Sequence, residues 1–449
     1  MKHLNRLAAL ALLLILCFTA AAGCAPADTD TATTTNSETT VSETPSETPE
    51  PAPAFDGLTI DGSYRIVIPT NADDITQKTA DLVAAAFREK AGLELPIVTD
   101  AEPEGARELV LGSTNRADYT ADVGWNLFLG GESVYIHSND HTRLYFATEA
   151  VLETWLTADF GLTEEGTVIL PKDRVADLNG LTTRLDNSIT VLSQNIRYGD
   201  DPNGNSVAER SSRFRQLMME YRPDLVGTQE TTAGWNKRFS TMIKYLDRYT
   251  DLGDYGMVGC SREGREATDG EWNTILYRKD RFELLDSDTT WLSDTPDVAS
   301  AVEGALCKRI CTWALLKDKQ TGDTILFANT HLDHSNDEVR SAQMNILMDY
   351  LADRIGQYPF YVTGDFNCNV DSVPYNTATE RLLDAHKTTW VDRSTATRTY
   401  HAYKESGGSE IDFIFHNEHT VPVSYEIISK DYGGFVSDHY GVIAEFVND

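Results

Sequence analysis

The sequence is poor in positive charge. Its 449 residues include 38 Lys and Arg against 70 Asp and Glu, which gives a formal net charge of −32 at pH 7. A protein that holds nucleic acid neutralises its phosphates with a basic face, so this composition argues against a long nucleic acid as partner. A bound divalent cation would reverse the field locally. We interpret most of the negative charge as a contribution to solubility.

Beyond its first residues the sequence has no apolar run that reaches the roughly 20 residues of a membrane-spanning helix. The chain begins with a short basic segment and an apolar run over residues 7–22, a pattern typical of a signal peptide. Ala21-Ala22-Gly23 then precede Cys24. This arrangement resembles the bacterial lipobox, which implies a signal peptide over 1–23, a lipidated Cys24 and an extracytoplasmic protein anchored to the bacterial cell membrane. Ordinary signal-peptide cleavage is the alternative.

Large apolar side chains are nearly absent from residues 24–54, which are rich in Thr, Ser, Glu and Pro. Such a segment cannot bury enough apolar surface to offset the entropy of ordering it. The composition therefore predicts a disordered tether, which its acidic residues and prolines favour as an extended chain.

Cysteine is scarce, with six residues in the whole chain. Two lie in the leader or at the lipidation site, and no second Cys/His pair accompanies the C-x3-C of Cys307 and Cys311 at the spacing of a zinc site. Buried free thiols, one disulfide and a metal role therefore remain as alternatives for the other four. These four are Cys260, Cys307, Cys311 and Cys368.

Apolar patterns alternate between strand and helix over residues 55–175. This alternation predicts a small α/β domain, followed by a linker over 176–187. The domain resembles the small α/β domain that precedes the catalytic barrel in hexosaminidases and α-glucuronidases. The resemblance rests on Tyr64–Pro69, Gly92–Asp100 and Leu109–Arg116. No cluster of catalytic residue types occurs here, so we expect a role in packing or substrate presentation, with glycan binding as the alternative.

From residue 188 to 449 many strands alternate with few helices, which predicts two packed sheets with outer helices. Helical patterns occur near 206–220 and 337–355. Several predicted strands end in polar residues suited to metal or phosphate chemistry. These are Asn195 in SQNIR, Glu230 in GTQE, His331 in THLDH, Asp365 and Asn367 in TGDFN, Asp412 in IDFIF, and Asp438 and His439 in SDHYGV.

Each motif alone is common, but together and in this order they resemble the endonuclease/exonuclease/phosphatase superfamily, also called DNase I-like. The resemblance covers residues 188–449. It implies a four-layered α/β sandwich with the site at one rim, placed after the small α/β domain. It also implies a metal-dependent hydrolase of phosphate esters.

The resemblance implies a role for each residue. Glu230 would bind Mg²⁺ or Mn²⁺, with Asn195 as a second ligand or a supporting group, because hard cations prefer oxygen ligands. His439 would be the general base, and Asp438 would orient its imidazole. His331 would donate to the phosphoryl oxygen.

The remaining acids and amides have supporting roles in the same scheme. Asp365 and Asn367 lie two residues apart, so in an extended segment they would point to the same side. The resemblance implies that Asp365 contacts a metal-bound water or assists the leaving group. It implies that the amide of Asn367 donates a hydrogen bond to the phosphate. Asp412 resembles a buried acid that orients a catalytic histidine, or a ligand of a second cation.

Other candidates carry weaker signals. Glu271 would steady the first histidine, and Arg197 and Arg309 would contact phosphate, with exposed surface cations as the alternative. Asp333 and His334 extend the THLDH motif and would line the same pocket.

The sequence thus predicts a phosphoesterase that uses histidine-activated water on a small or lipid-linked phosphate ester. Two alternatives remain: a nuclease, either DNase-like or a deadenylase-like 3′–5′ exonuclease, and a non-catalytic surface binding protein. The oligomeric state stays open.

The lipidation site yields a first prediction. Cys24→Ala removes the thiol that would carry the lipid, so the protein should leave the membrane fraction or remain unprocessed. Membrane fractionation with palmitate labelling measures both. The assignment would be contradicted if the wild type takes up no palmitate label and the Cys24→Ala variant stays in the membrane fraction.

Overall fold

The computed structural model describes residues 56–118 and 124–448. The signal peptide, Cys24 and the tether lie outside these residues, so their assignment stays a prediction. Within the described ranges, no helix combines the length and the apolar character needed to cross a membrane.

Two large sheets form the centre of the part that carries the predicted catalytic residues. The first has seven strands, in the order β10 (Tyr255–Val258), β11 (Trp272–Arg278), β9 (Leu225–Thr231), β8 (Ile189–Asn195), β20 (Gly441–Asn448), β19 (Thr420–Ile428) and β17 (Val391–Asp392). The second has six, in the order β12 (Phe282–Trp291), β13 (Ile310–Asp318), β14 (Thr324–His331), β15 (Phe360–Asp365), β18 (Asp412–His416) and β16 (Leu383–Asp384).

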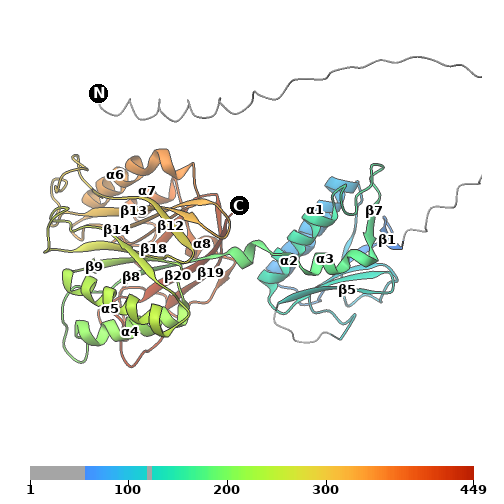
Figure 1. Ribbon diagram of the computed structural model, residues 1–449, viewed down its shortest axis with the longest axis horizontal. Helices are drawn as coiled ribbons and strands as arrows, with labels where there is room; N and C mark the ends of the chain where they lie inside the picture. The colour runs from blue at the N-terminus through green and yellow to red at the C-terminus, as the bar shows by residue number, and fades with distance from the viewer. Residues whose placement is uncertain (1–55, 119–123, 449) are drawn as a thin grey trace, which may run out of the picture. The chain divides into compact units, whose positions relative to one another are not determined.

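Helices cover the outer face of each sheet, which makes four layers (Figure 1). Apolar side chains such as Phe214 and Trp235 pack α4 and α5 onto the seven-stranded sheet, and Leu347 packs α6 onto the six-stranded sheet beside α7. A third apolar cluster, including Phe327 and Ile414, fills the space between the sheets. The helices are α4 (Val207–Tyr221), α5 (Ala233–Tyr249), α6 (Asp337–Ile355), α7 (Val373–Thr379) and α8 (Ala385–Thr388).

Residues 57–171 build a separate core around a five-stranded sheet. Phe87 on α1 and Trp155 on α2 meet edge to face in this core, with ring centroids 5.5 Å apart. Its strands in sheet order are β3 (Ile97–Thr99), β2 (Arg65–Ile68), β4 (Glu108–Leu111), β6 (Ser133–Ser138) and β5 (Trp125–Gly130), with helices α1 (Asp74–Ala91) and α2 (His141–Trp155) and the pair β1 (Gly57–Ile60) and β7 (Val168–Pro171).

The predicted linker over 176–187 contains short helical turns rather than only irregular chain. Leu178 of α3 is buried in the core of the five-stranded sheet. The turns are η1 (Lys172–Arg174), α3 (Val175–Asn179) and η2 (Arg184–Asn187). The proposed domain boundaries stay a prediction.

The predicted fold class, an α/β sandwich of four layers with a small α/β unit before it, is confirmed. Sequence reasoning missed α5, β12 and β19. Their patterns are present in the chain: Trp235, Phe239 and Leu246 recur at helical spacing on α5, and Val421, Val423 and Tyr425 alternate on β19.

Gly227 lets the two sheets approach closely where polar side chains cross between them. A Cβ atom built at this glycine would lie 1.9 Å from Thr363 Oγ1 and 2.7 Å from Asn329 Oδ1. Gln229 donates to Asn329 Oδ1 (2.7 Å), and Asn329 Nδ2 donates to the carbonyl of Thr228 (2.9 Å). These bonds join β9 to β14 directly beside the predicted catalytic residues.

Gly227→Ala should therefore destabilise the protein, because the methyl group forces the sheets apart. Overpacking of this kind costs about 1–3 kcal/mol, which thermal denaturation measures. Gly234→Ala is the matched control, since the nearest atom to its Cβ lies at 3.6 Å. Equal stability of the two variants would show that the sheets do not depend on this contact.

Candidate active site

Strand pairing brings the predicted catalytic residues to one edge of the sandwich. His331 at the end of β14 pairs with Asp365 at the end of β15, and Asp365 pairs with Asp412 at the start of β18. In the other sheet Asn195 on β8 pairs with Gln229 on β9, one residue before Glu230. The register of the two sheets thus gathers residues that lie far apart in the sequence.

The backbone departs from extended geometry at three of these positions. Arg197, Glu230 and Asn367 have φ angles of 56°, 58° and 48°, in the left-handed region that non-glycine residues rarely adopt. Strained backbone of this kind clusters at functional sites. It also corrects our reasoning for Asp365 and Asn367, because the segment between them is not an extended strand.

Asn367 nevertheless reaches the same cluster by this turn. Its backbone N–H donates to Asp365 Oδ1 (3.0 Å), while its side-chain Nδ2 lies 3.0 Å from His331 Nε2 and 3.0 Å from the Leu332 carbonyl oxygen. The amide therefore links the two strand ends.

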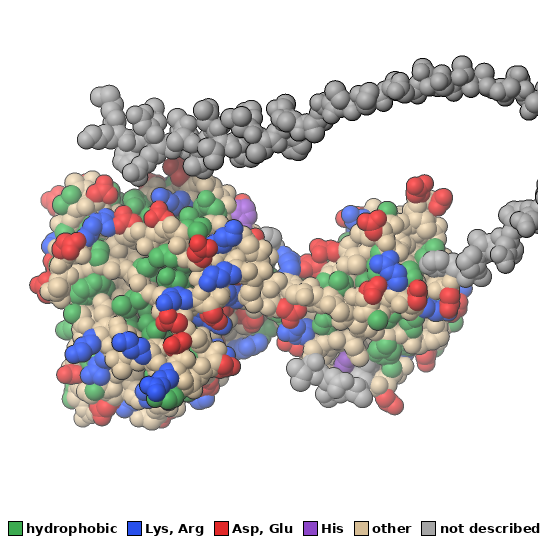
Figure 2. Space-filling view, viewed as in Figure 1, with side chains coloured by type: hydrophobic (Ala, Val, Ile, Leu, Met, Phe, Trp, Pro, Cys, Tyr) green, Lys and Arg blue, Asp and Glu red, His purple; other side chains and the backbone are tan. Residues whose placement is uncertain are grey.

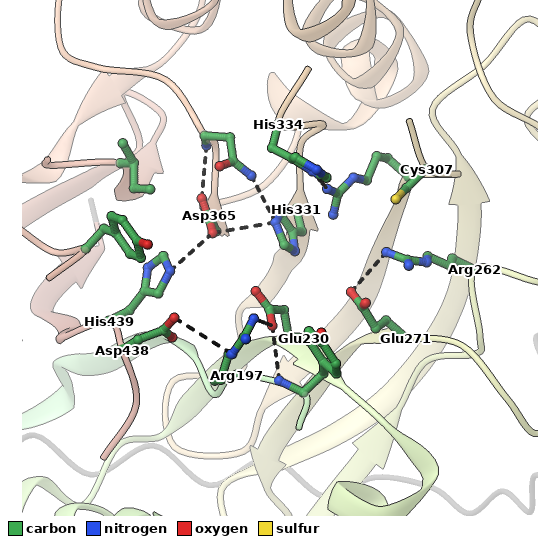
Figure 3. A pocket seen from close by; sticks show the side chains of 15 residues that line it. Arg197, Glu230, Arg262, Glu271, Cys307, His331, His334, Asp365, Asp438 and His439 are labelled. Atoms are coloured by element: carbon green, nitrogen blue, oxygen red, sulfur yellow. Dashed lines mark hydrogen bonds and ion pairs between the residues drawn. The ribbon is translucent and has the colours of Figure 1, made fainter. Parts of the chain in front are cut away.

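These side chains line a pocket of about 490 Å³ (Figure 3). Asp365 and His439 lie on one side of it, and Arg262 and Glu271 lie on the other. The lining residues are Arg197, Tyr198, Glu230, Arg262, Glu271, Cys307, Arg309, His331, His334, Asp365, Asn367, Tyr400, Ile411, Asp438 and His439.

Asp365 is buried at the centre of the site. Its Oδ2 accepts a hydrogen bond from Asn195 Nδ2 (2.9 Å) and lies 3.5 Å from His331 Nε2 and 3.8 Å from His439 Nε2. Burial and then the neighbouring Asp412 raise the pKa of Asp365 to about 7, against the opposing effect of His439.

The acid that contacts His439 is Asp412 rather than Asp438. Asp412 Oδ2 lies 2.8 Å from His439 Nδ1, so the orienting role predicted for Asp438 is wrong in this respect, and the orienting alternative for Asp412 fits. Asp438 instead accepts from Ser437 Oγ (3.2 Å) and lies 3.9 Å from Arg197 Nε. Asp438 and His439 are neighbours in the chain, but Asp438 contacts Ser437 and lies near Arg197, whereas His439 contacts Asp412.

His439 carries positive charge readily in this setting. Burial alone lowers its pKa, but the charge and hydrogen bond of Asp412, together with Asp365 and Asp438, raise the pKa of His439 to about 10. His331 behaves in the opposite way, because burial and then Arg309 hold its pKa well below the usual value. The two imidazoles therefore differ in protonation state at neutral pH.

Glu230 and Asn195 form a pair fixed from two sides. Asn195 Nδ2 donates to Glu230 Oε1 (3.0 Å), and the backbone N–H of Tyr198 donates to Glu230 Oε2 (3.0 Å). The N–H of Arg197 donates to Asn195 Oδ1 (3.0 Å). Both side chains are held in one orientation at the pocket.

Glu271 contacts Arg262, not the first histidine. Arg262 Nη1 lies 2.9 Å from Glu271 Oε2, and His331 Nδ1 is buried without a hydrogen-bond partner. The predicted contact between Glu271 and His331 is therefore wrong. Burial raises the pKa of Glu271, while Arg262 lowers it.

Both arginines predicted to contact phosphate line the pocket, yet each is already surrounded by other groups. Arg197 lies near three carboxylates: Asp201 (3.2 Å), Glu230 (3.8 Å) and Asp438 (3.9 Å). Arg309 is buried, 3.5 Å from an oxygen of Asp333 and 3.0 Å from Nδ1 of His334.

Sequence reasoning did not name four of the lining residues as site residues: Arg262, Tyr198, Tyr400 and Ile411. Tyr198 follows Arg197 in the SQNIRY stretch, so proximity to a motif was available as a signal. Arg262 and Tyr400 lie in loops outside every motif, and only the fold brings them here.

The acidic residues fit a divalent cation. Asp365, Asp412 and His439 offer ligand atoms that all lie within 4.8 Å of one another, and Asp412 Oδ1 is buried without a hydrogen-bond partner. Buried carboxylates at such density need a compensating positive charge, and their oxygens suit Mg²⁺ or Mn²⁺. The residues predicted as ligands, Glu230 and Asn195, lie beside this group.

The four cysteines among the residues that the structure describes are free thiols. Cys311 and Cys368 are buried, and Cys307 lines the pocket. Burial raises the pKa of Cys311 and of Cys368 to about 12. These two thiols therefore stay protonated and are packing groups.

Comparison with known proteins identifies the family. The family model described as Endonuclease/Exonuclease/phosphatase family matches residues 192–439, more than half of the chain. None of the curated proteins matches this sequence.

Solved structures agree with this match over the sandwich. A family protein from Bacteroides vulgatus is 31% identical, with a TM-score of 0.54, and a second from Bacteroides thetaiotaomicron is 27% identical, with a TM-score of 0.53. The mannosyl-6-phosphatase of Bacteroides thetaiotaomicron is 26% identical, with a TM-score of 0.51. Each match covers 58% of this chain and 98–99% of the other.

Enzymes of this family are hydrolases that act on phosphoester bonds, typically with a divalent metal. The motifs, the four-layered sandwich, the pocket at its edge and the family model agree. This chain belongs to the endonuclease/exonuclease/phosphatase family.

Proposed function

We propose that this protein is a divalent-metal-dependent phosphoesterase that hydrolyses a small phosphate ester, of the size of a sugar phosphate. One observation carries the proposal: buried acids and two histidines lie in a pocket of about 490 Å³. That volume falls within the range of small-molecule sites. The likeness to a mannosyl-6-phosphatase supports a sugar phosphate as the substrate class.

The acidity of the chain supports a small substrate over a polymer. On the face visible in Figure 2, Lys and Arg are interspersed with Asp and Glu rather than gathered into one basic surface. Long nucleic acids bind through many neutralised phosphates. We therefore rank the nuclease alternative below the small-ester phosphoesterase.

We assign the metal to the oxygens of Glu230 and Asn195. They would hold Mg²⁺ or Mn²⁺, which would supply positive charge for the phosphate and lower the pKa of water. Asp412 Oδ1, which is buried without a hydrogen-bond partner, would be available to a second ion.

We propose a role for His439 other than the predicted general base. The neighbouring carboxylates raise its pKa, so its Nε2 would donate to a phosphoryl oxygen. Asp365, with a pKa of about 7, suits the proton acceptor, because an acceptor works best near the operating pH. His331, which is neutral, and Asn367 hold Asp365 in place.

The predicted signal peptide favours a reaction outside the cytoplasm. We propose that lipid on Cys24 anchors the enzyme outside the cytoplasmic membrane and that the tether over 24–54 gives it reach. Its substrates would then be phosphate esters present outside the cytoplasm, including lipid-linked ones.

The histidine–acid pair provides a test of the electrostatics. In metal-free protein His439 should titrate near pH 10, and Asp412→Asn should lower the midpoint, because the variant loses the largest of the effects that oppose burial. Imidazole NMR shifts followed against pH in the presence of EDTA measure this. An unchanged midpoint in the variant would show that Asp412 does not hold the proton on His439.

The function itself is tested by a substrate screen. Residues 55–449 with Mg²⁺ or Mn²⁺ should release phosphate from hexose phosphates faster than they cleave DNA, RNA or sphingomyelin. EDTA should abolish turnover. Faster cleavage of nucleic acid would favour the nuclease alternative, and turnover undiminished by EDTA would contradict the metal mechanism.

Two variants separate metal binding from proton transfer. Glu230→Gln removes a charged ligand, so activity should fall and recover in part at high metal concentration. His439→Ala removes a charged donor, and a loss of about 10²–10³-fold is expected, as for a lost transition-state donor, with no recovery by added metal. Equal rescue of both variants would contradict these separate roles.

A further inference from the structure

Arg210 is a buried cation without an ion pair. It lies on α4, its side chain is fully buried, and no carboxylate among the residues that the structure describes forms a salt bridge with it. Burying an unpaired charge is unfavourable unless hydrogen bonds compensate for it. For Arg210 that compensation comes from backbone carbonyl groups.

Its hydrogen-bond partners are all backbone carbonyl oxygens of one loop, and its guanidinium also lies over the ring of Trp235, 5.6 Å from the centroid. Nε donates to Asn205 (2.8 Å), Nη1 donates to Ile196 and to Arg197 (3.0 Å), and Nη2 donates to Gly199. The planar fork of arginine reaches these carbonyls at once, which the single nitrogen of lysine does not. The loop that follows β8 is thereby wrapped around one side chain.

This loop controls the orientation of Glu230 and Asn195. Arg197, held in the left-handed region with φ 56°, turns its N–H to Asn195 Oδ1 (3.0 Å). The next N–H, of Tyr198, donates to Glu230 Oε2 (3.0 Å). The indole of Trp235 donates to the Arg197 carbonyl (3.0 Å), beside the bonds from Arg210.

We propose that Arg210 is a positioning residue for the metal site. Its guanidinium fixes the carbonyls of Ile196 and Arg197. The same two peptide planes carry the N–H groups of Arg197 and Tyr198, which are thereby aimed at Asn195 and Glu230. The proposal rests on the proposed function, because it assigns metal binding to Glu230 and Asn195. Arg210 itself touches neither substrate nor metal.

The buried fork also explains the energetics of the turn. A left-handed non-glycine residue is strained, and it persists only where surrounding contacts impose it. Arg210 and Trp235 supply these contacts from two different helices, α4 and α5. Loss of the fork should therefore relax the turn without removing either metal ligand.

The test compares direct metal binding in matched variants. Arg210→Lys keeps the charge, and Arg210→Met keeps the length and apolar stem. Both should fold, by circular dichroism, yet bind Mn²⁺ about 10–100-fold more weakly in calorimetry, the usual effect of losing an orienting partner. The concentration of Mg²⁺ needed for half-maximal activity should rise in parallel.

Arg215→Lys and Arg215→Met are the controls, because Arg215 lies on the same helix with its guanidinium over the ring of Tyr245. They should bind Mn²⁺ like the wild type. The proposal is overturned if the Arg210 variants also bind Mn²⁺ within about twofold of the wild type. It is overturned equally if neither Arg210 variant folds, because the arginine then supports the whole domain.

The proposed function fails in a different way. Wild-type protein that binds no Mn²⁺ would remove the metal from the mechanism, and with it the positioning role. Wild-type binding with unchanged binding in the Arg210 variants would overturn the positioning role alone.

Discussion

The site depends on the close polar contact between the two sheets. Gly227 leaves room for Thr363 and Asn329, and the bonds between Gln229 and Asn329 lock β9 to β14. Each sheet alone holds only part of the machinery. Asn195 and Glu230 belong to one sheet, and His331, Asp365 and Asp412 belong to the other. A displacement of one sheet along the other would separate Asn195 and Glu230 from Asp365 and would break the bond between Asn195 and Asp365.

Electrostatics explains why the acids tolerate one another. Asp365, Asp412 and Asp438 lie near a single imidazole, and together they raise the pKa of His439 while mutual repulsion and burial raise that of Asp365. Such an arrangement is costly unless a cation or a proton compensates it. The site is therefore built to receive positive charge and, with it, a phosphate. A cation bound at the site would reverse the local field, so an acidic protein can still bind an anionic substrate.

Sequence reasoning predicted the fold class through the superfamily that the ordered motifs resemble, and it named most of the residues that line the pocket. It assigned two contacts wrongly. The resemblance paired Asp438 with His439, whereas Asp412 is the acid that contacts Nδ1 of the imidazole. Glu271 was paired with His331, but Arg262 lies nearer and binds it. The contacts of His439 with Asp412 and of Glu271 with Arg262 cannot be predicted from a sequence motif, because the residues in each pair lie in different motifs or loops.

The amino-acid sequence by itself determined which chemistry is available: oxygen ligands, two histidines in the motifs, the order of strands and motifs, and an acidic chain. Those features are local, since each depends on residue type and on spacing within one strand or leader. The tertiary structure alone decided which acid holds which histidine, where left-handed turns aim the backbone N–H groups, and how Arg210 reaches the loop after β8. These contacts depend on the direction of each side chain and on how the two sheets pack against each other. Neither is determined by one segment of the sequence.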